Sequence, residues 1–274
     1  MNKFYITNPN NLDKYLKLDI SGFIFGIEKF SSEFNSYISL DNLSDLCDKC
    51  KNNNKDIIIF LNRLYFEHEI DSLKKLIIEL SNYDVIIGFA DDAVLNILDE
   101  IGFKGDSMLI SNHLGTNSYT INFYLEKGVK NTYISTEITK EEINEIIKNT
   151  MSNIFIKGYG YLNMATSSRK LLTNYFKFID KNKDKNNYTF KDFVTSKEFK
   201  IVEDYNSNFY TGDIYSCLKY LNELDNLNII LDNYMIDEDN FYEEVNNFIN
   251  HNIKDEGYTG FLDKKTVYKV EDYE

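Results

Sequence analysis

Short runs of apolar residues recur along the chain, with room for a helix between most of them. Most of these runs are continuous rather than alternating, which is typical of parallel strands that are covered on both faces. Eight runs are predicted to form strands, at residues 22–27, 56–61, 84–89, 106–110, 131–135, 153–157, 199–203 and 228–231. The pattern therefore predicts a parallel sheet with helices around it.

The segments between these runs carry the spacing of amphipathic helices. Apolar residues fall on one helical face within 41–51, within 67–81 and within about 237–250. Thr139 and Glu142 have the spacing of a capping box, which opens a further helix. Strands and helices are therefore predicted to alternate along most of the chain.

Eight strands with intervening helices in 274 residues favour a closed (β/α)8 TIM-like barrel, with an open doubly wound sheet as the alternative. We expect a single barrel domain over residues 1–256, with a polar, Lys- and Asn-rich insertion at about 176–198. Residues 257–270 are predicted to form a β-hairpin that turns at Asp263 and Lys264, so that 257–274 would be an extension packed on the barrel.

Polar residues follow most of the predicted strands. In a barrel the carboxyl ends of the strands meet at one mouth, where such folds hold their catalytic and binding groups. The residues are Glu28, Asn62, Arg63, Asp91, Asn112, His113, Glu137, Lys157 and Asp232. Polar residues also end strands for structural reasons alone, and Asp91 can instead cap the helix that follows it. The set is the main candidate for a shared pocket.

Glu137 and Lys157 are the favoured reactive pair. They follow adjacent predicted strands, so a barrel mouth would bring the carboxylate and the ammonium group close enough to shift each other's pKa. A structural ion pair at the mouth is the alternative.

The stretch 158–175 combines more special residue types than any other part of the chain. Gly158 and Gly160 allow a turn that a Cβ atom would obstruct. Arg169 and Lys170 place two cations beyond that turn. In a barrel this loop would lie at the carboxyl end of a strand, so it is a candidate substrate-binding loop.

The composition of the chain argues against several classes of function. The net charge of −14 argues against broad, non-specific nucleic-acid binding, although it allows a local basic pocket. No stretch has the length of a transmembrane helix, and the N-terminus has no apolar segment of a secretory signal. We therefore expect a cytoplasmic protein with neither a membrane nor DNA as its partner.

Cys47 and Cys50 have the CxxC spacing that occurs in metal and redox sites. Both fall on the apolar face of a predicted helix, and Cys217 is distant in the sequence, so burial in the core is the favoured interpretation. None of the three histidines has the spacing of a zinc site. No metal is expected.

Five segments of the chain resemble, in order, the family called peptidase U32. They are 59–63 (Ile-Phe-Leu-Asn-Arg), 83–91 (Tyr-Asp-Val-Ile-Ile-Gly-Phe-Ala-Asp), 114–117 (Leu-Gly-Thr-Asn), 128–143 and 155–175. Residues 260–270 resemble the end of the short members of the family. Because that family adopts a TIM-like barrel, the resemblance implies the fold that the apolar pattern predicts.

The resemblance also implies a class of activity. The family is named for collagenase-like proteases, and other members are implicated in oxygen-independent hydroxylation of a tRNA uridine, a ribosomal RNA cytidine and a ubiquinone precursor. The tRNA branch takes its hydroxyl group from prephenate, and several members use a cysteine-ligated iron–sulfur cluster. We therefore expect an enzyme or enzyme subunit of tRNA uridine hydroxylation, with tRNA as partner and prephenate as co-substrate. A collagenase-like protease is an alternative.

The chain lacks residues of the family signature that are associated with the chemistry. A glutamate and a cysteine of the family signature are replaced by Asn153 and Tyr161, and the later cysteines are missing. No iron–sulfur cluster is therefore expected on this chain. A second alternative follows, in which a catalytically silent barrel acts as an accessory subunit of a cysteine-bearing U32 paralogue.

On this basis we assign roles to eight residues. Catalytic roles are expected for Glu137, Lys157 and Asn62, and substrate-binding roles for Arg63, Asp91, Asn117, Arg169 and Tyr161. Arg63, Lys157 and Arg169 would hold an anionic substrate, such as a dicarboxylate or a phosphate. Glu137 would act as general acid or base, while Asn62 and Asn117 would orient the substrate.

Overall fold

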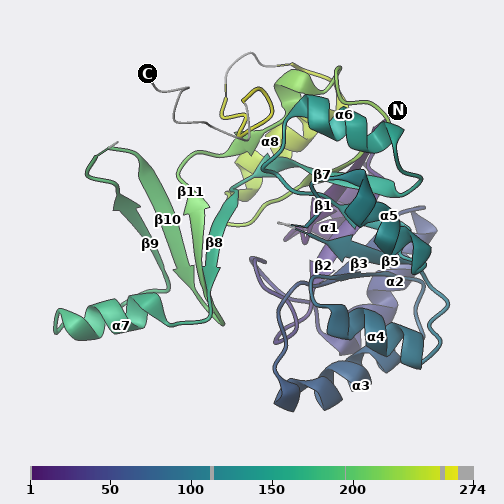
Figure 1. The fold of residues 1–274 in the computed structure, drawn as a ribbon, viewed down its shortest axis with the longest axis horizontal. Coiled ribbons are helices and arrows are strands. Elements are labelled where there is room, and N and C mark those ends of the chain that lie inside the picture. The colour runs from purple at the N-terminus through teal and green to yellow at the C-terminus, as the bar shows by residue number, and fades with distance from the viewer. Residues whose placement is uncertain (1, 112–113, 195, 254–256, 265–274) are drawn as a thin grey trace.

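Eight parallel strands close into a barrel in the computed structural model, which describes residues 2–111, 114–194, 196–253 and 257–264 (Figure 1). The order is β7-β13-β1-β2-β3-β4-β5-β6, and β6 pairs again with β7. The strands are β1 (Lys3–Thr7), β2 (Gly22–Gly26), β3 (Asp56–Leu61), β4 (Ile86–Phe89), β5 (Ser107–Ile110), β6 (Asn131–Tyr133), β7 (Asn153–Gly160) and β13 (Asn228–Leu231). The predicted TIM-like barrel is confirmed.

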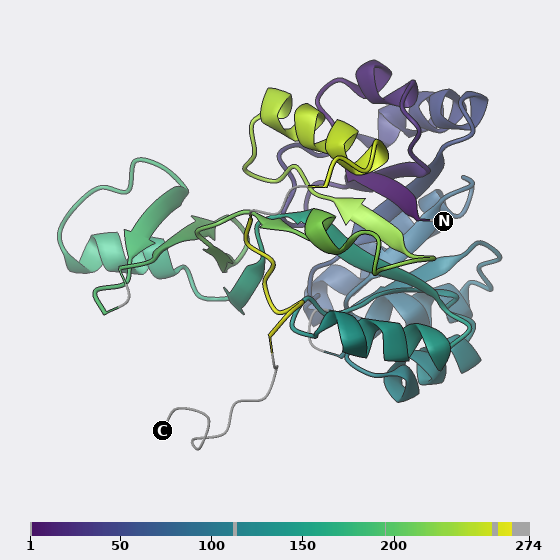
Figure 2. The ribbon, with the colours of Figure 1, turned by 90° about the horizontal axis from the view of Figure 1, so that it is seen from above.

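Helices surround the barrel (Figure 2). They are α1 (Leu12–Leu16), α2 (Leu43–Asn52), α3 (Ile70–Leu80), α4 (Asp92–Glu100), α5 (Ser118–Glu126), α6 (Lys140–Lys148) and α8 (Glu238–Ile249), with short 3-10 helices at Leu40–Asn42, Glu67–Glu69 and Leu218–Tyr220. The predicted capping box opens α6, where the Glu142 amide donates to Thr139 Oγ1 at 3.2 Å and the Thr139 amide donates to Glu142 Oε2 at 2.7 Å. Among the described helices, none is both long and apolar enough to pass through a membrane.

The strands are apolar on both faces because each face is buried. Along β3, Ile58 and Phe60 point into the barrel and join a small interior cluster. Ile57, Ile59 and Leu61 alternate with them and pack under the helices in the larger core cluster. This two-sided burial is the reason that the sequence shows continuous apolar runs instead of alternating ones.

Two strand assignments differ from the prediction. Residues 199–203 lie in β10 (Glu198–Glu203), which is an antiparallel strand outside the barrel. The eighth barrel position belongs instead to β1, which pairs with β2 and β13. The assignment of 199–203 was wrong because Lys200 interrupts its apolar residues, and this alternation is typical of an antiparallel strand with one polar face.

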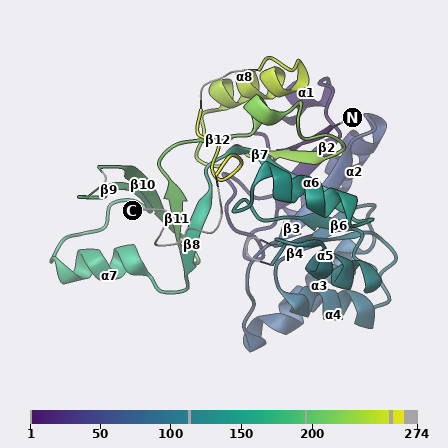
Figure 3. The ribbon, with the colours of Figure 1, turned by 45° about the horizontal axis from the view of Figure 1, so that its top comes forward.

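Between β7 and β13 the chain leaves the barrel and forms a second, antiparallel sheet, which we call the insertion sheet (Figure 3). Its order is β8-β11-β10-β9, with α7 between β8 and β9. The bounds are β8 (Asn163–Ser167), α7 (Leu171–Phe178), β9 (Asn187–Lys191) and β11 (Ser207–Thr211). The expected polar insertion at about 176–198 lies within this sheet. The chain returns through β12 (Tyr215–Ser216), which pairs with β7.

The two faces of the insertion sheet have different neighbours. Helix α7 covers the outer face, where Phe176 packs on Tyr188 with ring centres 5.0 Å apart. Lys200 pairs with Thr189 and with Tyr210, so these three side chains share the opposite, inner face. The inner face lies toward the barrel, because Tyr210 packs against Tyr234 in the loop after β13. Their ring centres are 5.8 Å apart.

The predicted C-terminal hairpin falls partly outside the described residues. Tyr258 forms a parallel bridge with Tyr215, and Leu262 is buried in the main core cluster. Residues 265–274 lie outside the described part of the chain, so the hairpin stays a prediction.

Candidate functional site

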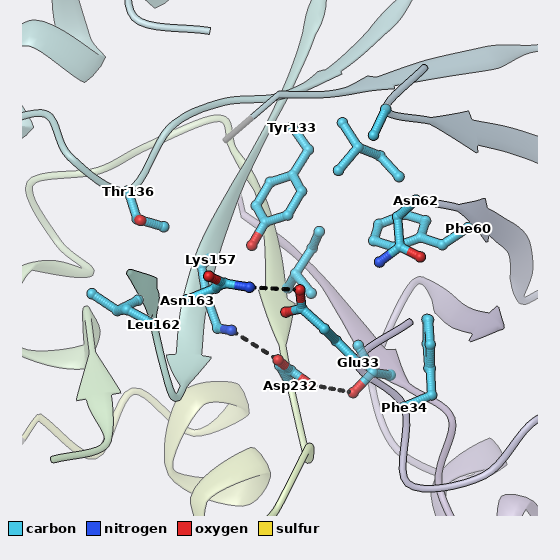
Figure 4. Close-up of a pocket in the computed structure, with 14 residues that line it drawn as sticks. Glu33, Phe34, Phe60, Asn62, Tyr133, Thr136, Lys157, Leu162, Asn163 and Asp232 are labelled. Atoms are coloured by element: carbon cyan, nitrogen blue, oxygen red, sulfur yellow. Dashed lines mark hydrogen bonds and ion pairs between the residues drawn. The ribbon is translucent and has the colours of Figure 1, made fainter. Parts of the chain in front are cut away.

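A small cavity of about 90 Å³ lies at the carboxyl ends of the barrel strands, and we call it the mouth cavity (Figure 4). Its polar lining consists of Thr7, Glu33, Asn62, Tyr133, Thr136, Lys157, Asn163 and Asp232, and Phe34, Phe60 and Ile110 are among its apolar residues. Three residues that were predicted to meet at the barrel mouth, Asn62, Lys157 and Asp232, therefore line one cavity.

Lys157 lies on β7 and is only 8% exposed. Its Nζ atom donates to Asp232 Oδ2 at 2.8 Å and to the Tyr161 carbonyl at 2.6 Å. Burial lowers the pKa of Lys157, but Asp232, with help from Tyr133 and Glu33, outweighs burial, so the pKa is raised. Lys157 is therefore a cation that uses two of its three N–H bonds in these contacts.

Asp232 follows β13 and is fixed from both sides. Its Oδ1 atom accepts hydrogen bonds from Thr7 Oγ1 and from the Tyr234 amide, each at 3.0 Å. Thr7 Oγ1 in turn accepts from the Asn233 amide at 2.9 Å. Each carboxylate oxygen of Asp232 thus has a partner, and the Lys157–Asp232 pair is held in one geometry.

Two glycines let Lys157 and Asp232 approach each other. The pairing of β7 with β13 shifts register after Lys157, and a Cβ atom at Gly158 would lie 2.3 Å from Ile229 Cγ2. Gly160 has φ +125, and a Cβ atom there would lie 2.9 Å from the Asp232 carbonyl and 3.0 Å from Lys157 Cε. The expected turn is not formed, because both glycines lie within β7 and the strand continues to Gly160. The glycines instead allow the contact between the two charged side chains beside the register shift.

We expect Gly160→Ala to destabilise the protein by about 3 kcal/mol, because strained backbone and crowding against Lys157 combine. Gly102→Ala is the matched control, since Gly102 also has a positive φ but has nothing within 4 Å of an added Cβ. The control should cost about 1 kcal/mol. Urea unfolding measures both, and equal losses would show that the contact with Lys157 is not crowded.

Glu33 lies in the loop after β2 and joins the pair from the opposite side of the cavity (Figure 4). Its backbone has φ +68, and its Oε1 atom accepts from Asn163 Nδ2 at 2.7 Å. Burial raises the pKa of Glu33, and Asp232 raises it further, against the opposing effect of Lys157. A carboxyl group that keeps its proton to higher pH than usual can both donate and accept a proton in a reaction.

Tyr133 completes the polar group beside Lys157 (Figure 4). Burial raises the pKa of Tyr133 to about 12, although the charge of Lys157 opposes the shift. Its hydroxyl therefore remains protonated at neutral pH and is available as a donor. The ring stacks against Phe60 with centres 6.3 Å apart.

Glu137 does not lie in this group. It is exposed and does not line the cavity, and its neighbour Thr136 does. Strand β6 ends at Tyr133, two residues before the predicted end at 135, so Glu137 belongs to the following loop. The predicted Glu137–Lys157 pair is therefore not formed, and Lys157 pairs with Asp232 instead.

Three of the predicted site residues hold local structure. Asp91 caps α4 through the Ala93 amide at 2.9 Å and also accepts from the Tyr65 amide at 3.0 Å. Asn117 is exposed and caps α5. Asn62 lines the cavity, but both of its amide atoms bond to the backbone of Ser32, so it positions the loop that carries Glu33.

The remaining predicted residues lie toward the insertion sheet. Arg63 is 9% exposed, pairs with Glu69 at 3.1 Å and lies over the ring of Tyr205, in the β10–β11 turn, at 4.4 Å. Tyr161 binds Lys157 through its carbonyl, while its ring lies under Lys200 at 4.2 Å. Arg169 is exposed beyond β8. Asn112 and His113 fall outside the described residues.

Several other residues around the cavity were not predicted to belong to the site. Glu33, Thr7, Tyr133 and Asn163 were not singled out, although each contacts or faces the Lys157–Asp232 pair. Thr7 ends β1, so recognising that strand would have placed it at the mouth. Glu33 lies in an irregular loop without a motif, and no sequence signal marks it.

The cysteines do not fit the donor set of an iron–sulfur cluster. Cys47 and Cys50 lie on α2, whereas Cys217 follows β12. Cys50 and Cys217 are fully buried. Burial raises the pKa of Cys47 and Cys50 to about 11 and that of Cys217 to about 12, whereas a cluster needs thiolates. Within the described ranges, no three His, Cys, Asp or Glu side chains gather as a metal site would require.

The model of peptidase family U32 matches residues 8–230, a range that begins after β1 and ends within β13. A curated relative from Bacillus subtilis (strain 168), tRNA hydroxylation protein P2, is 22% identical over 239 residues, which cover 84% of this chain and 77% of that protein. The solved structure of the U32 peptidase Mk0906 is 12% identical, with 58% of this chain and 69% of that chain covered and a TM-score of 0.47.

Proposed function

The chain belongs to peptidase family U32, and from this premise we propose that it takes part, as an enzyme or enzyme subunit, in the hydroxylation of a tRNA uridine. The name of its curated relative, a tRNA hydroxylation protein, supports this direction. The observation that carries the proposal is the meeting of Glu33, Lys157 and Asp232 in one cavity at the barrel mouth. Enzymes of this fold place their chemistry at that end of the strands.

The size of the mouth cavity limits what it can bind. Pockets for whole ligands usually measure ~300–1,000 Å³, whereas this cavity measures about 90 Å³. It can therefore receive one end of a substrate, such as a carboxylate group, near Lys157. Prephenate, which carries two carboxylates, is the co-substrate that we propose for this position.

The charges around the cavity allow a carboxylate to bind only when Glu33 is protonated. Asp232 already balances Lys157, so an incoming carboxylate would meet the negative charge of Glu33 unless that side chain is protonated. Protonated Glu33 would donate to the carboxylate, and Tyr133 is a second donor beside it. Carboxylate binding should thus be accompanied by uptake of a proton, which Glu33 can later return to the reacting molecule.

Peptide hydrolysis finds less support in the same geometry. Among the described lining residues, Thr7 and Thr136 carry aliphatic hydroxyls that could act as nucleophiles. Thr7 donates to Asp232 rather than to a neutral base, and no base is paired with Thr136 among the described contacts. Lys157, with its raised pKa, is protonated and cannot take up the proton of a nucleophile.

The accessory-subunit alternative is favoured by one observation, the misfit of the cysteines to a cluster. If the reaction needs such a cluster, a cysteine-bearing paralogue would supply it. Purified chain that hydroxylates a tRNA transcript only when the paralogue is added would favour the subunit role. Activity of the chain alone with prephenate would favour the enzyme role.

The proposal is tested by deleting this chain from cells and digesting their tRNA to nucleosides for mass spectrometry. We expect the hydroxylated uridine and its derivatives to disappear, and a plasmid copy of the wild-type chain to restore them. Unchanged levels of these nucleosides in the deletion strain would contradict the proposal.

A further inference from the structure

A second cavity, of about 430 Å³, lies between the insertion sheet and the loops that follow β2 and β13. We call it the sheet groove. Asn187, Thr189 and Lys200 line it from the inner face of the sheet, and Phe34 and Tyr234 line it from the barrel. Phe34 also lines the mouth cavity, so the two cavities are neighbours. A ligand in the sheet groove could therefore extend one group into the mouth.

The insertion sheet differs in charge from the rest of the protein. Between residues 163 and 211 there are nine Lys and Arg and six Asp and Glu, a net charge of +3 in a chain whose net charge is −14. Lys185 and Lys200 both line the sheet groove. Lys200 lies over the Tyr161 ring at 4.2 Å, and Tyr234 lines the groove from the barrel. The groove thus offers two lysines with aromatic residues nearby, a combination that binds single-stranded nucleic acid.

Two buried polar groups on the inner face lack partners. Asn208 pairs with Val202 on β10, and Tyr210 pairs with Lys200. Each is 1% exposed, yet Asn208 Nδ2 and the Tyr210 hydroxyl have no hydrogen-bond partner among the described residues. Buried polar groups are rarely left unbonded, because desolvation without a hydrogen bond costs free energy. Neither residue lines the sheet groove or the mouth cavity, so both groups lie beneath the inner face, beside Val202 and Lys200, which do line the groove.

We propose that the sheet groove binds the backbone of the tRNA strand next to the nucleotide that is presented to the mouth cavity. This inference rests on the proposed function, since it names the surface by which the same site would hold its RNA substrate. Phosphates would lie at Lys185 and Lys200, and sugar or base groups would pair with the polar side chains of Asn187 and Thr189. An RNA strand is favoured over a protein partner because this segment carries a net charge of +3, while the whole chain carries −14.

The first test measures binding of a labelled tRNA transcript to the full chain by fluorescence anisotropy at several salt concentrations. We expect the double variant K185A/K200A to bind about tenfold more weakly at low salt, with a plot of log K against log salt that is shallower by about 1–2. Lys177→Ala is the matched control, because this exposed lysine belongs to α7, which covers the outer face of the sheet, away from the groove. It should bind as the wild type does, and Lys200→Arg should retain binding.

The second test uses Tyr210→Phe, which removes only the unpartnered hydroxyl. Without ligand, we expect an equal or higher melting temperature, because a buried group without a partner is removed. Binding of the tRNA transcript should be unchanged, because Tyr210 does not line the groove. Weakened binding in this variant would place the RNA at the buried seam between sheet and barrel instead of in the groove, and would overturn the inference.

The outcomes separate this inference from the proposed function. If the wild type and K185A/K200A bind the transcript equally, or if the wild type does not bind it, the groove is not the RNA site. The nucleoside analysis of the deletion strain still decides the proposed function in either case. If the double variant retains RNA binding but loses a co-purifying protein subunit, the groove is a protein interface and the inference is overturned.

Discussion

Replacing Glu33 by glutamine is expected to lower the rate of tRNA uridine hydroxylation by roughly 10²–10⁴-fold, the usual effect of losing a general acid or base. Glutamine keeps the size of the side chain and can still contact Asn163, but it cannot exchange a proton. Because the amide is uncharged, a substrate carboxylate should still bind beside Lys157. The loss should therefore appear in kcat with little change in KM.

Binding as a function of pH gives a second result for the same variant. The raised pKa of Glu33 means that its proton is lost as pH rises through that value, and carboxylate binding to the wild type should weaken over the same range. In the glutamine variant this pH dependence should vanish. Titration calorimetry with prephenate at a series of pH values measures it.

Glu137→Gln is the matched control for Glu33→Gln. It removes the same charge from an exposed carboxylate at the same end of the barrel, outside the mouth cavity. We expect it to retain full activity. Loss of activity in Glu137→Gln together with a fully active Glu33→Gln variant would restore the assignment that the sequence suggested and would contradict the role given to Glu33.

Replacing Asp232 by asparagine is expected to destabilise the protein by about 3 kcal/mol, because it leaves the charge of Lys157 without its buried partner. Both side chains are largely buried, with 9% and 14% of their surface exposed. Asparagine can still accept a hydrogen bond from Thr7, so the loss would report mainly on charge. Urea denaturation at neutral pH measures the change in the free energy of unfolding.

Two further variants serve as controls for the loss of stability in Asp232→Asn. Glu100→Gln breaks the exposed pair between Lys74 and Glu100 and should cost at most about 1 kcal/mol. The double variant K157M/D232N removes both charges and should recover most of the stability lost by Asp232→Asn, because no uncompensated charge remains. Equal costs for the buried and exposed pairs would mean that Lys157 is better solvated than the geometry indicates.

The barrel could be predicted because its strands are buried on both faces, and such burial leaves continuous apolar runs. Strand β1 was missed although Tyr5 and Ile6 are buried, since the segment is short and lies at the very start of the chain. The insertion sheet was seen only as a polar interruption. Its strands have one face under α7 and the other toward a groove, so they alternate and lack the signal of the barrel strands.

The candidate site could be predicted in part because strand ends follow from strand positions. Lys157 and Asp232 end neighbouring strands, and both were expected at the mouth. The partner of Lys157 was assigned wrongly because a difference of two residues in the end of β6 moves Glu137 out of the cavity. Glu33 depends on the path of a long loop, which is fixed by tertiary contacts such as the bonds from Asn62 to Ser32 rather than by local sequence.

We propose that this chain takes part in tRNA hydroxylation through the charged group at its barrel mouth. The most direct measurement is mass spectrometry of tRNA nucleosides from cells that lack the chain and express the K157M/D232N variant at the wild-type level. The variant is expected to keep the fold but lacks both charges, so hydroxylated uridine should stay as low as in the deletion strain. Recovery of the modification to the wild-type level would contradict the role proposed for Lys157 and Asp232.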